Sequence, residues 1–71
     1  MNEIEEVYRG HNITVFACGD LESIVYGDGA DWMAQMADVT NHGDRWRLWF
    51  GHREDAETEA KRRLRIMCDG K

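Results

Sequence analysis

A tryptophan-rich segment followed by a charged run constrains the fold of this chain more than any other feature. The segment reads RWRLWFG over residues 45–51, and the run over residues 54–65 has its acids first and its bases last. The segment predicts a strand, in which every second side chain shares a face. One face then carries Trp46, Leu48 and Phe50, and the other carries Arg45, Arg47 and Trp49.

The charged run predicts a C-terminal helix. Asp55 is placed to cap it, and the order of acids before bases suits the helix dipole. The pairs Glu57–Lys61 and Glu59–Arg63 have the spacing of one helical turn. An apolar stripe is formed by Ala56, Ala60, Leu64, Met67 and Cys68. The small alanines let this helix lie close to a sheet, and Gly70 is a natural stop.

Three further strands are predicted in the first half of the chain, over residues 4–9, 13–18 and 22–26. Gly10-His11-Asn12 and Gly19-Asp20 supply the turns between them, and residues 27–31 are expected to form a loop. Residues 13–18 are nearly all apolar or β-branched, which is typical of a central strand.

Residues 32–39 have two interpretations. Met, Ala and Gln favour a helix capped by Asp31. The interpretation we prefer is a hairpin with residues 45–51 in which Thr40 pairs with Arg45. That register sets Asp38 opposite Arg47 and Met36 opposite Trp49, which are favourable cross-strand pairs. On the other, apolar face, Gln35 is then the one polar residue that does not fit the pattern.

The fold class expected from these elements is α+β: an antiparallel sheet of four to five strands with one C-terminal helix packed on one face. A chain of 71 residues makes a single domain, over residues 1–71, near the lower size limit for a self-sufficient core. Domains of this size often gain buried area by forming a homodimer or by docking on a partner.

The net charge of −5 is distributed unevenly. Residues 1–44 hold nine acids and one base, giving −8, whereas residues 45–71 hold five acids and eight bases, giving +3. The acidic part repels nucleic acid and attracts a basic surface, although acids also keep small proteins soluble. We therefore expect a protein partner with a basic surface.

No secretory signal or apolar run of membrane-spanning length is present in the sequence. A cytoplasmic location follows as the expectation. In that compartment the two cysteines, Cys18 and Cys68, are expected to be reduced and not bridged.

Catalytic, metal-binding and cofactor motifs are missing from the sequence. His11, His42 and His52 form no local ligand pair with each other or with a cysteine, and no GxSxG surrounds Ser23. The glycines occur singly and form no phosphate-binding loop. We expect no enzyme activity, no metal and no cofactor.

The outward face of the last strand is the candidate binding surface. In the preferred hairpin, Trp49 is joined by Trp32 and Met36 and flanked by Asp38, Arg45 and Arg47, a composition typical of interface hot spots. The alternatives are that these residues bury one another, or that Arg45, Arg47 and Trp49 bind nucleic acid by stacking and phosphate contacts. The acids of the helix balance its bases, so direct nucleic-acid binding is the less favoured hypothesis.

Residues 46–64, a Trp-rich strand before an Ala-x-x-x-Ala-Lys-Arg helix, resemble the end of many small phage and mobile-element proteins. Some acidic members of that group are anti-CRISPR or other anti-defence inhibitors, which share no common site. The resemblance implies a phage-encoded inhibitor that occludes a basic nucleic-acid-binding surface of a defence complex in the cytoplasm of a bacterial host. The expected contacts are the apolar Trp32, Met36 and Trp49 together with Glu5, Glu6, Asp28, Asp31, Asp38, Arg45 and Arg47.

Overall fold

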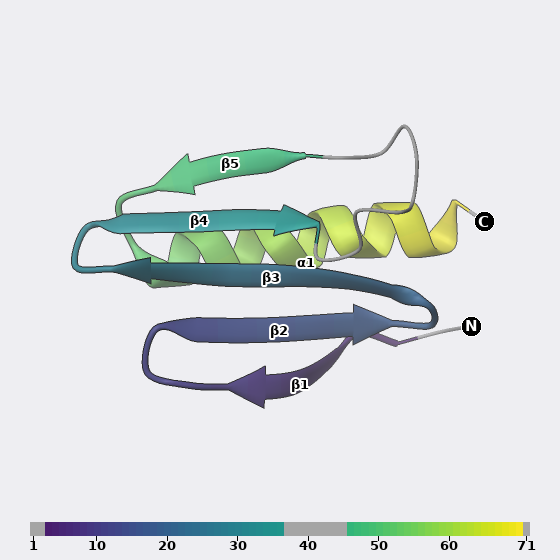
Figure 1. The fold of residues 1–71 in the computed structure, drawn as a ribbon. Coiled ribbons are helices and arrows are strands. Elements are labelled where there is room, and N and C mark those ends of the chain that lie inside the picture. The colour runs from purple at the N-terminus through teal and green to yellow at the C-terminus, as the bar shows by residue number, and fades with distance from the viewer. Residues whose placement is uncertain (1–2, 37–45, 71) are drawn as a thin grey trace.

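Among the residues that the structure describes, five strands precede one helix (Figure 1). The computed structural model describes residues 3–36 and 46–70. Its elements are β1 (Glu5–Arg9), β2 (Ile13–Cys18), β3 (Leu21–Asp28), β4 (Asp31–Met36), β5 (Arg47–Phe50) and α1 (Arg53–Asp69). The strands form one sheet in the order β1-β2-β3-β4-β5, and each is antiparallel to its neighbours. The predicted α+β class is confirmed.

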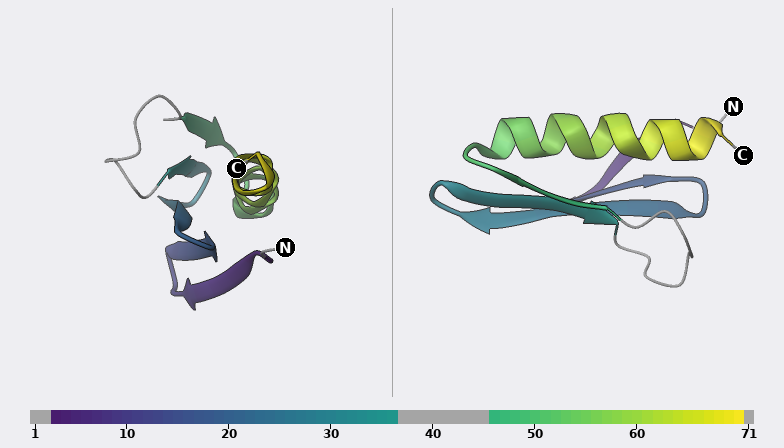
Figure 2. Two further views of the ribbon diagram at one scale, coloured as in Figure 1. Left: turned by 90° about the vertical axis from the view of Figure 1, so that its right-hand side faces the viewer. Right: turned by 90° about the horizontal axis from the view of Figure 1, so that it is seen from above.

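Helix α1 lies across one face of this sheet (Figure 2). Ala56, Ala60 and Leu64 are all fully buried, so the helix packs two small side chains and one large one against the sheet. From the sheet, Phe16, Val25 and Trp32 contribute to the same core. The predicted apolar stripe is confirmed, and its alanines allow the close approach that makes a single-helix core possible in so short a chain.

Two-residue turns fix the register of the central hairpins. Cys18 pairs with Leu21 around Gly19-Asp20, and Asp28 pairs with Asp31 around Gly29-Ala30. Both turn glycines have positive φ, 63° for Gly19 and 60° for Gly29, a region that side chains disfavour. The loop expected over residues 27–31 is therefore shorter than predicted, because β3 and β4 extend into it.

Gly27 permits a close contact between β3 and β4. It pairs with Trp32, and a Cβ added at Gly27 would lie 2.1 Å from the carbonyl oxygen of Asp31 and 2.9 Å from Cδ2 of the Trp32 side chain. The indole nitrogen of Trp32 donates to the carbonyl oxygen of Gly29 at 2.8 Å. Trp32 is thus held over a glycine that leaves room for it.

Residues 31–36 form a strand, which confirms the hairpin interpretation over residues 32–36, but the predicted register is wrong. Residues 37–39 and the expected Thr40–Arg45 pair lie outside the described residues. Gln35 pairs with Arg47 and Met33 pairs with Trp49, three residues away from the expected pairing. An odd shift exchanges the two faces of a strand. In the observed register Trp32, Ala34 and Met36 enter the core, whereas the expected one would have turned Gln35 toward the helix. The free energy gained by burying these apolar side chains is larger than that of one cross-strand charge pair.

The ends of α1 differ in part from the prediction. The N-cap is His52, which makes no side-chain capping bond, and the expected cap Asp55 lies inside the first turn. Gly70 ends the helix as expected, and its backbone N–H donates to the carbonyl oxygen of Ile66 at 3.0 Å. Among the described residues, no helix has the length and apolar character that crossing a membrane requires.

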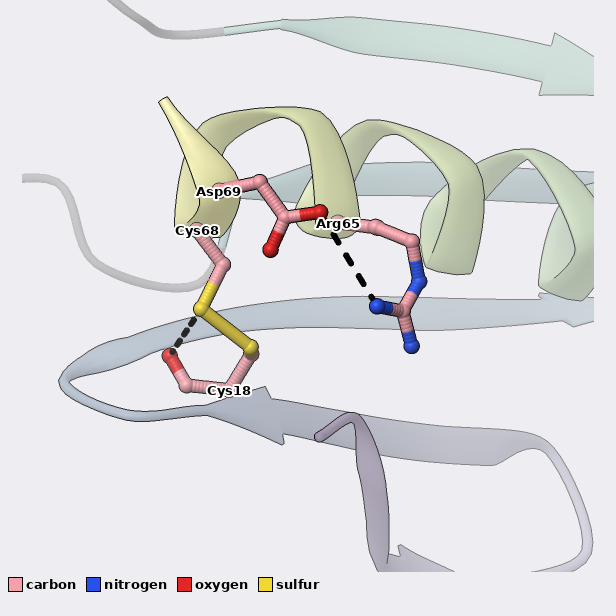
Figure 3. The surroundings of a disulfide bond; sticks show 4 residues. All are labelled: Cys18, Arg65, Cys68 and Asp69. Atoms are coloured by element: carbon pink, nitrogen blue, oxygen red, sulfur yellow. Dashed lines mark hydrogen bonds and ion pairs between the residues drawn. A yellow bond between two sulfur atoms is a disulfide. The ribbon is translucent and has the colours of Figure 1, made fainter. Parts of the chain in front are cut away.

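The expectation of reduced cysteines is wrong for this structure. A disulfide joins Cys18 at the end of β2 to Cys68 in the last turn of α1 (Figure 3). The two Cα atoms are 6.2 Å apart, a separation that a disulfide spans without backbone movement. A sequence separation of 50 residues gave no sign of this proximity, which arises only when the helix lies back along the sheet.

Candidate protein-docking face

No helix or strand of the described residues covers the face of the sheet opposite α1 (Figure 2). We call it the open face and define it by strand alternation. It comprises Glu5, Tyr8, Ile13, Val15, Ala17, Glu22, Ile24, Tyr26, Asp28, Asp31, Met33, Gln35, Arg47 and Trp49. Its side chains form cross-strand rows, because residues paired in a ladder point to the same side.

Two adjacent rows form the apolar centre of the open face. The first row runs across four strands through Ile13, Tyr26, Met33 and Trp49. The second runs across all five strands through Tyr8, Val15, Ile24, Gln35 and Arg47. With strands about 4.8 Å apart, the first row is about 14 Å long. The first row and the Tyr8, Val15 and Ile24 part of the second row form an apolar strip, and the polar Gln35 and Arg47 end the second row.

Three aromatic side chains of this strip are exposed to solvent. Trp49 is 67% exposed, Tyr8 57% and Tyr26 39%. Met33, which lies between Tyr26 and Trp49 in its row, is only 2% exposed. The prediction that Trp49 points away from the helix is confirmed. Large aromatic side chains on a rigid ladder lose little conformational entropy when a partner covers them.

Acidic rows close both ends of the apolar strip. Glu5 and Glu22 flank Ala17 at one end, and Asp28 lies directly opposite Asp31 at the other. Glu22 and Asp28 are six residues apart on β3, or about 20 Å along the strand. Among the described residues of this face, Arg47 is the basic one, and its Nε donates to Oε1 of Gln35 at 3.2 Å. The open face is therefore apolar in the middle and negative at its ends.

Several predicted contact residues lie elsewhere. Trp32 and Met36 are 7% and 4% exposed in the core, a consequence of the shifted register, so they are unavailable to a partner. Glu6 lies 3.4 Å from Arg9, as an ion pair on the helix side of β1. Asp38 and Arg45 lie outside the described residues. Trp49, Arg47, Glu5, Asp28 and Asp31 do gather on the open face.

The sequence reading missed Tyr8 and Tyr26. Tyr26 follows from the two-residue turn at Gly19-Asp20, which fixes the register of β2 and β3 and places Tyr26 opposite Ile13. Tyr8 had no such signal. Simple alternation puts Glu6 and Tyr8 on one face, but an irregularity in the ladder between them turns Tyr8 to the open face.

A partly buried polar cluster on the other side of the sheet ties the start of α1 to the β1–β2 hairpin. Arg53 Nη2 donates to the carbonyl oxygen of Gly10 at 2.8 Å and to Oγ1 of Thr14 at 2.8 Å. Glu57 Oε2 accepts from Arg9 at 2.7 Å, from Thr14 at 2.7 Å and from Arg53 at 3.1 Å. Burial alone raises the pKa of Glu57, but the hydrogen bonds from Thr14 and Arg53 and the charge of Arg9 lower it overall.

This cluster has the character of a structural clamp. The Glu57 carboxylate, with a lowered pKa and three donors, is unsuited to take up a proton at neutral pH. The Arg53 guanidinium also lies 5.1 Å from the centre of the Trp32 ring. The expected Glu57–Lys61 pair is replaced by this cluster, and Lys61 lies over the Phe16 ring at 5.6 Å.

The bases of α1 are largely engaged by neighbouring groups. Arg62 and Arg63 both donate to Glu59, which confirms the predicted Glu59–Arg63 pair. The hydrogen bond from Arg62 is the main cause that lowers the pKa of Glu59 to about 2. Arg65 lies 3.9 Å from Asp69. These contacts weaken the hypothesis that the helix holds phosphates.

The described residues contain no group of three or more His, Cys, Asp or Glu side chains that is arranged to hold a metal. Compared with protein-family models, curated proteins and solved structures, the chain has no match.

Proposed function

We propose that this protein is a non-enzymatic binding module whose open face docks on a protein with a basic surface. The observation that carries the proposal is the exposed Trp49 within an apolar strip that is bounded by acidic rows. Such a strip suits a partner with an apolar centre and basic flanks. The aromatic centre would supply most of the affinity, and the acids would speed encounter and select the partner.

The charges of the open face argue against nucleic acid as the direct ligand. Tyr8, Tyr26 and Trp49 have the character of a base-stacking platform. Binding nucleic acid also requires bases that neutralise phosphates, and the described part of this face has four acids and Arg47. A protein surface with an apolar centre and basic flanks would contact the aromatic side chains and form ion pairs with the acids.

The finer proposal concerns the kind of partner. A basic protein surface is commonly one that binds nucleic acid, so the module would compete with nucleic acid by steric occlusion. The resemblance of residues 46–64 to phage proteins favours a bacterial defence complex, of the CRISPR type, as the target. The module would then be a phage-encoded inhibitor.

The test is a binding measurement on a purified partner that has first been captured from the host with the tagged protein. Trp49→Ala is expected to weaken the affinity about 30-fold. Ile66→Ala is the matched control, because Ile66 is 58% exposed but belongs to α1, on the other side of the sheet. It should change the affinity less than about twofold. Equal effects of the two variants would refute the open face as the docking surface.

A charge reversal tests the role of the acidic rows. Glu22→Lys should slow association and reduce its dependence on salt. Asp69→Lys makes the same change in net charge at the far end of α1 and should leave the association rate nearly unchanged. Nucleic acid added to the complex should displace the module. A partner that binds nucleic acid and the module simultaneously would contradict occlusion.

A second copy of the chain is the alternative occupant. Face-to-face packing would bury the apolar strips of both copies, as in isologous dimers. Light scattering at micromolar concentration distinguishes the two cases. A monomer supports the proposal, whereas a dimer that dissociates on Trp49→Asp would identify the open face as a homodimer interface instead.

A further inference from the structure

The two ends of α1 are held to the sheet by different means. From its start to Leu64, the helix is held by the clamp of Arg53 and Glu57 and by the fully buried Ala56, Ala60 and Leu64. Beyond Leu64, Met67 and Cys68 are partly buried against the core, while Ile66 and Asp69 are exposed. Packing therefore weakens toward the C-terminus of the helix.

Electrostatics also disfavour the end of the helix. No basic residue lies in its last turn, where the dipole favours cations, and Asp69 places an acid there. The ion pair of Arg65 with Asp69 spans 3.9 Å between half-exposed groups, with the base N-terminal to the acid, which is the weaker orientation (Figure 3). Gly70 continues the right-handed helical backbone and forms no left-handed cap.

The disulfide lies where these other contacts are weakest. It ties Cys68, in the last turn, to Cys18, which is 1% exposed at the end of β2 (Figure 3). We propose that the Cys18–Cys68 disulfide is a redox-sensitive lock on the end of α1: the oxidised protein holds the helix end on the sheet, and reduction releases it while the sheet and the clamped half of the helix persist. The lock is independent of the proposed function, because both cysteines lie on the helix side.

Reduction proceeds by exchange with a dithiol. A thiolate attacks Sγ of Cys68, the less buried residue, and forms a mixed disulfide while Cys18 leaves as a thiolate. The second thiol of the reductant then attacks the mixed disulfide and frees Cys68. Two electrons pass to the protein, the reductant becomes a cyclic disulfide, and the two protons of its thiols balance the two thiols formed.

The test compares amide hydrogen exchange in the oxidised protein and in the protein reduced with dithiothreitol. Iodoacetamide labelling of the urea-unfolded protein first establishes the redox state: no cysteine should react before reduction and two should react after it. Reduction is expected to speed exchange about tenfold or more over residues 65–70. Exchange over residues 56–62 and in β3 should change less than about threefold.

A double variant, Cys18→Ala with Cys68→Ser, separates loss of the bond from other effects of the reductant. It should show the fast exchange of the reduced protein and no response to dithiothreitol. Three results would overturn the lock: labelling of cysteines before reduction, unchanged exchange at the helix end after it, or an equal acceleration in β3. The last would mean that the bond supports the whole fold and not the helix end.

Discussion

Met33 of β4 lies directly opposite Trp49 of β5, and the two side chains belong to the face of the sheet that α1 leaves uncovered. This pairing decides which tryptophan is structural and which is available to a partner. Because Met33 points away from α1, Trp32 beside it points toward α1 and into the core and is 7% exposed, whereas Trp49 is 67% exposed. The functional proposal follows from this register.

The two tryptophans should differ sharply in their effects on stability. Trp32→Ala should lower the free energy of unfolding by about 3–5 kcal/mol, because it removes a buried aromatic ring. Trp49→Ala should lower it by less than about 1 kcal/mol. Urea unfolding followed by circular dichroism measures both, and Trp32→Phe is the milder variant if Trp32→Ala does not fold. Equal losses would show that Trp49 is a core residue.

The Glu57 clamp should make stability depend on acidity. The pKa of Glu57 in the folded protein is lowered from 4.5, so its contribution is complete above about pH 4.5 and is lost as the pH falls through the folded value. Glu59, with a pKa lowered from 4.5 to about 2, acts in the same direction. The free energy of unfolding should therefore fall on acidification.

A variant isolates the part of that dependence due to Glu57. Glu57→Gln should cost about 1–3 kcal/mol at neutral pH, because it breaks a partly buried charged network. It should also flatten the loss of stability that sets in as the pH falls below about 4.5. Urea titrations at several pH values check both. A pH profile as steep as that of the unmodified protein would contradict the role given to Glu57.

Two neighbouring glycines should respond differently to substitution. Gly27→Ala should cost at least about 2 kcal/mol, because its Cβ would lie 2.1 Å from a backbone oxygen of Asp31. Gly29 has positive φ but open space around it, so Gly29→Asn, which tolerates that backbone, should cost less than about 1 kcal/mol. Thermal unfolding of the two variants provides the comparison. The reverse order would contradict the close approach of Trp32 to β3.

Ser23 offers a route to higher stability. Its hydroxyl is fully buried on the helix side of β3 and has no hydrogen-bond partner among the described residues. Ser23→Ala removes a polar group whose desolvation is uncompensated, so it should leave stability unchanged or raise it by about 1 kcal/mol. A loss larger than about 1 kcal/mol in urea unfolding would indicate that the hydroxyl does make a stabilising bond.

Local patterns were sufficient to predict most of the secondary structure. The strand at residues 13–18 matches β2 at both ends, because its apolar and β-branched run is bounded by turn residues. The helix was predicted from its charge order and alanine spacing, and the outward direction of Trp49 from alternation alone. These features depend on neighbours in sequence.

Features that depend on distant parts of the chain were not predictable in the same way. The observed pairing of β4 with β5 buries Trp32 under α1. Comparing the residues that face each other in a hairpin does not include this contact with the helix. The irregularity that turns Tyr8 outward and the approach of Cys68 to Cys18 likewise arise only once the sheet and helix are assembled. Of the predicted surface residues, Trp49 therefore lies exposed as expected, whereas Trp32 lies in the core.

Oxidative footprinting of the tryptophans, in the free protein and in its complex with the captured partner, tests the central claim most directly. The reactivity of each indole is measured by peptide mass spectrometry. We expect Trp49 to be oxidised quickly in the free protein and to be protected about tenfold in the complex, while Trp32 reacts slowly in both. An indole of Trp49 that stays equally reactive in the complex would contradict docking through the open face.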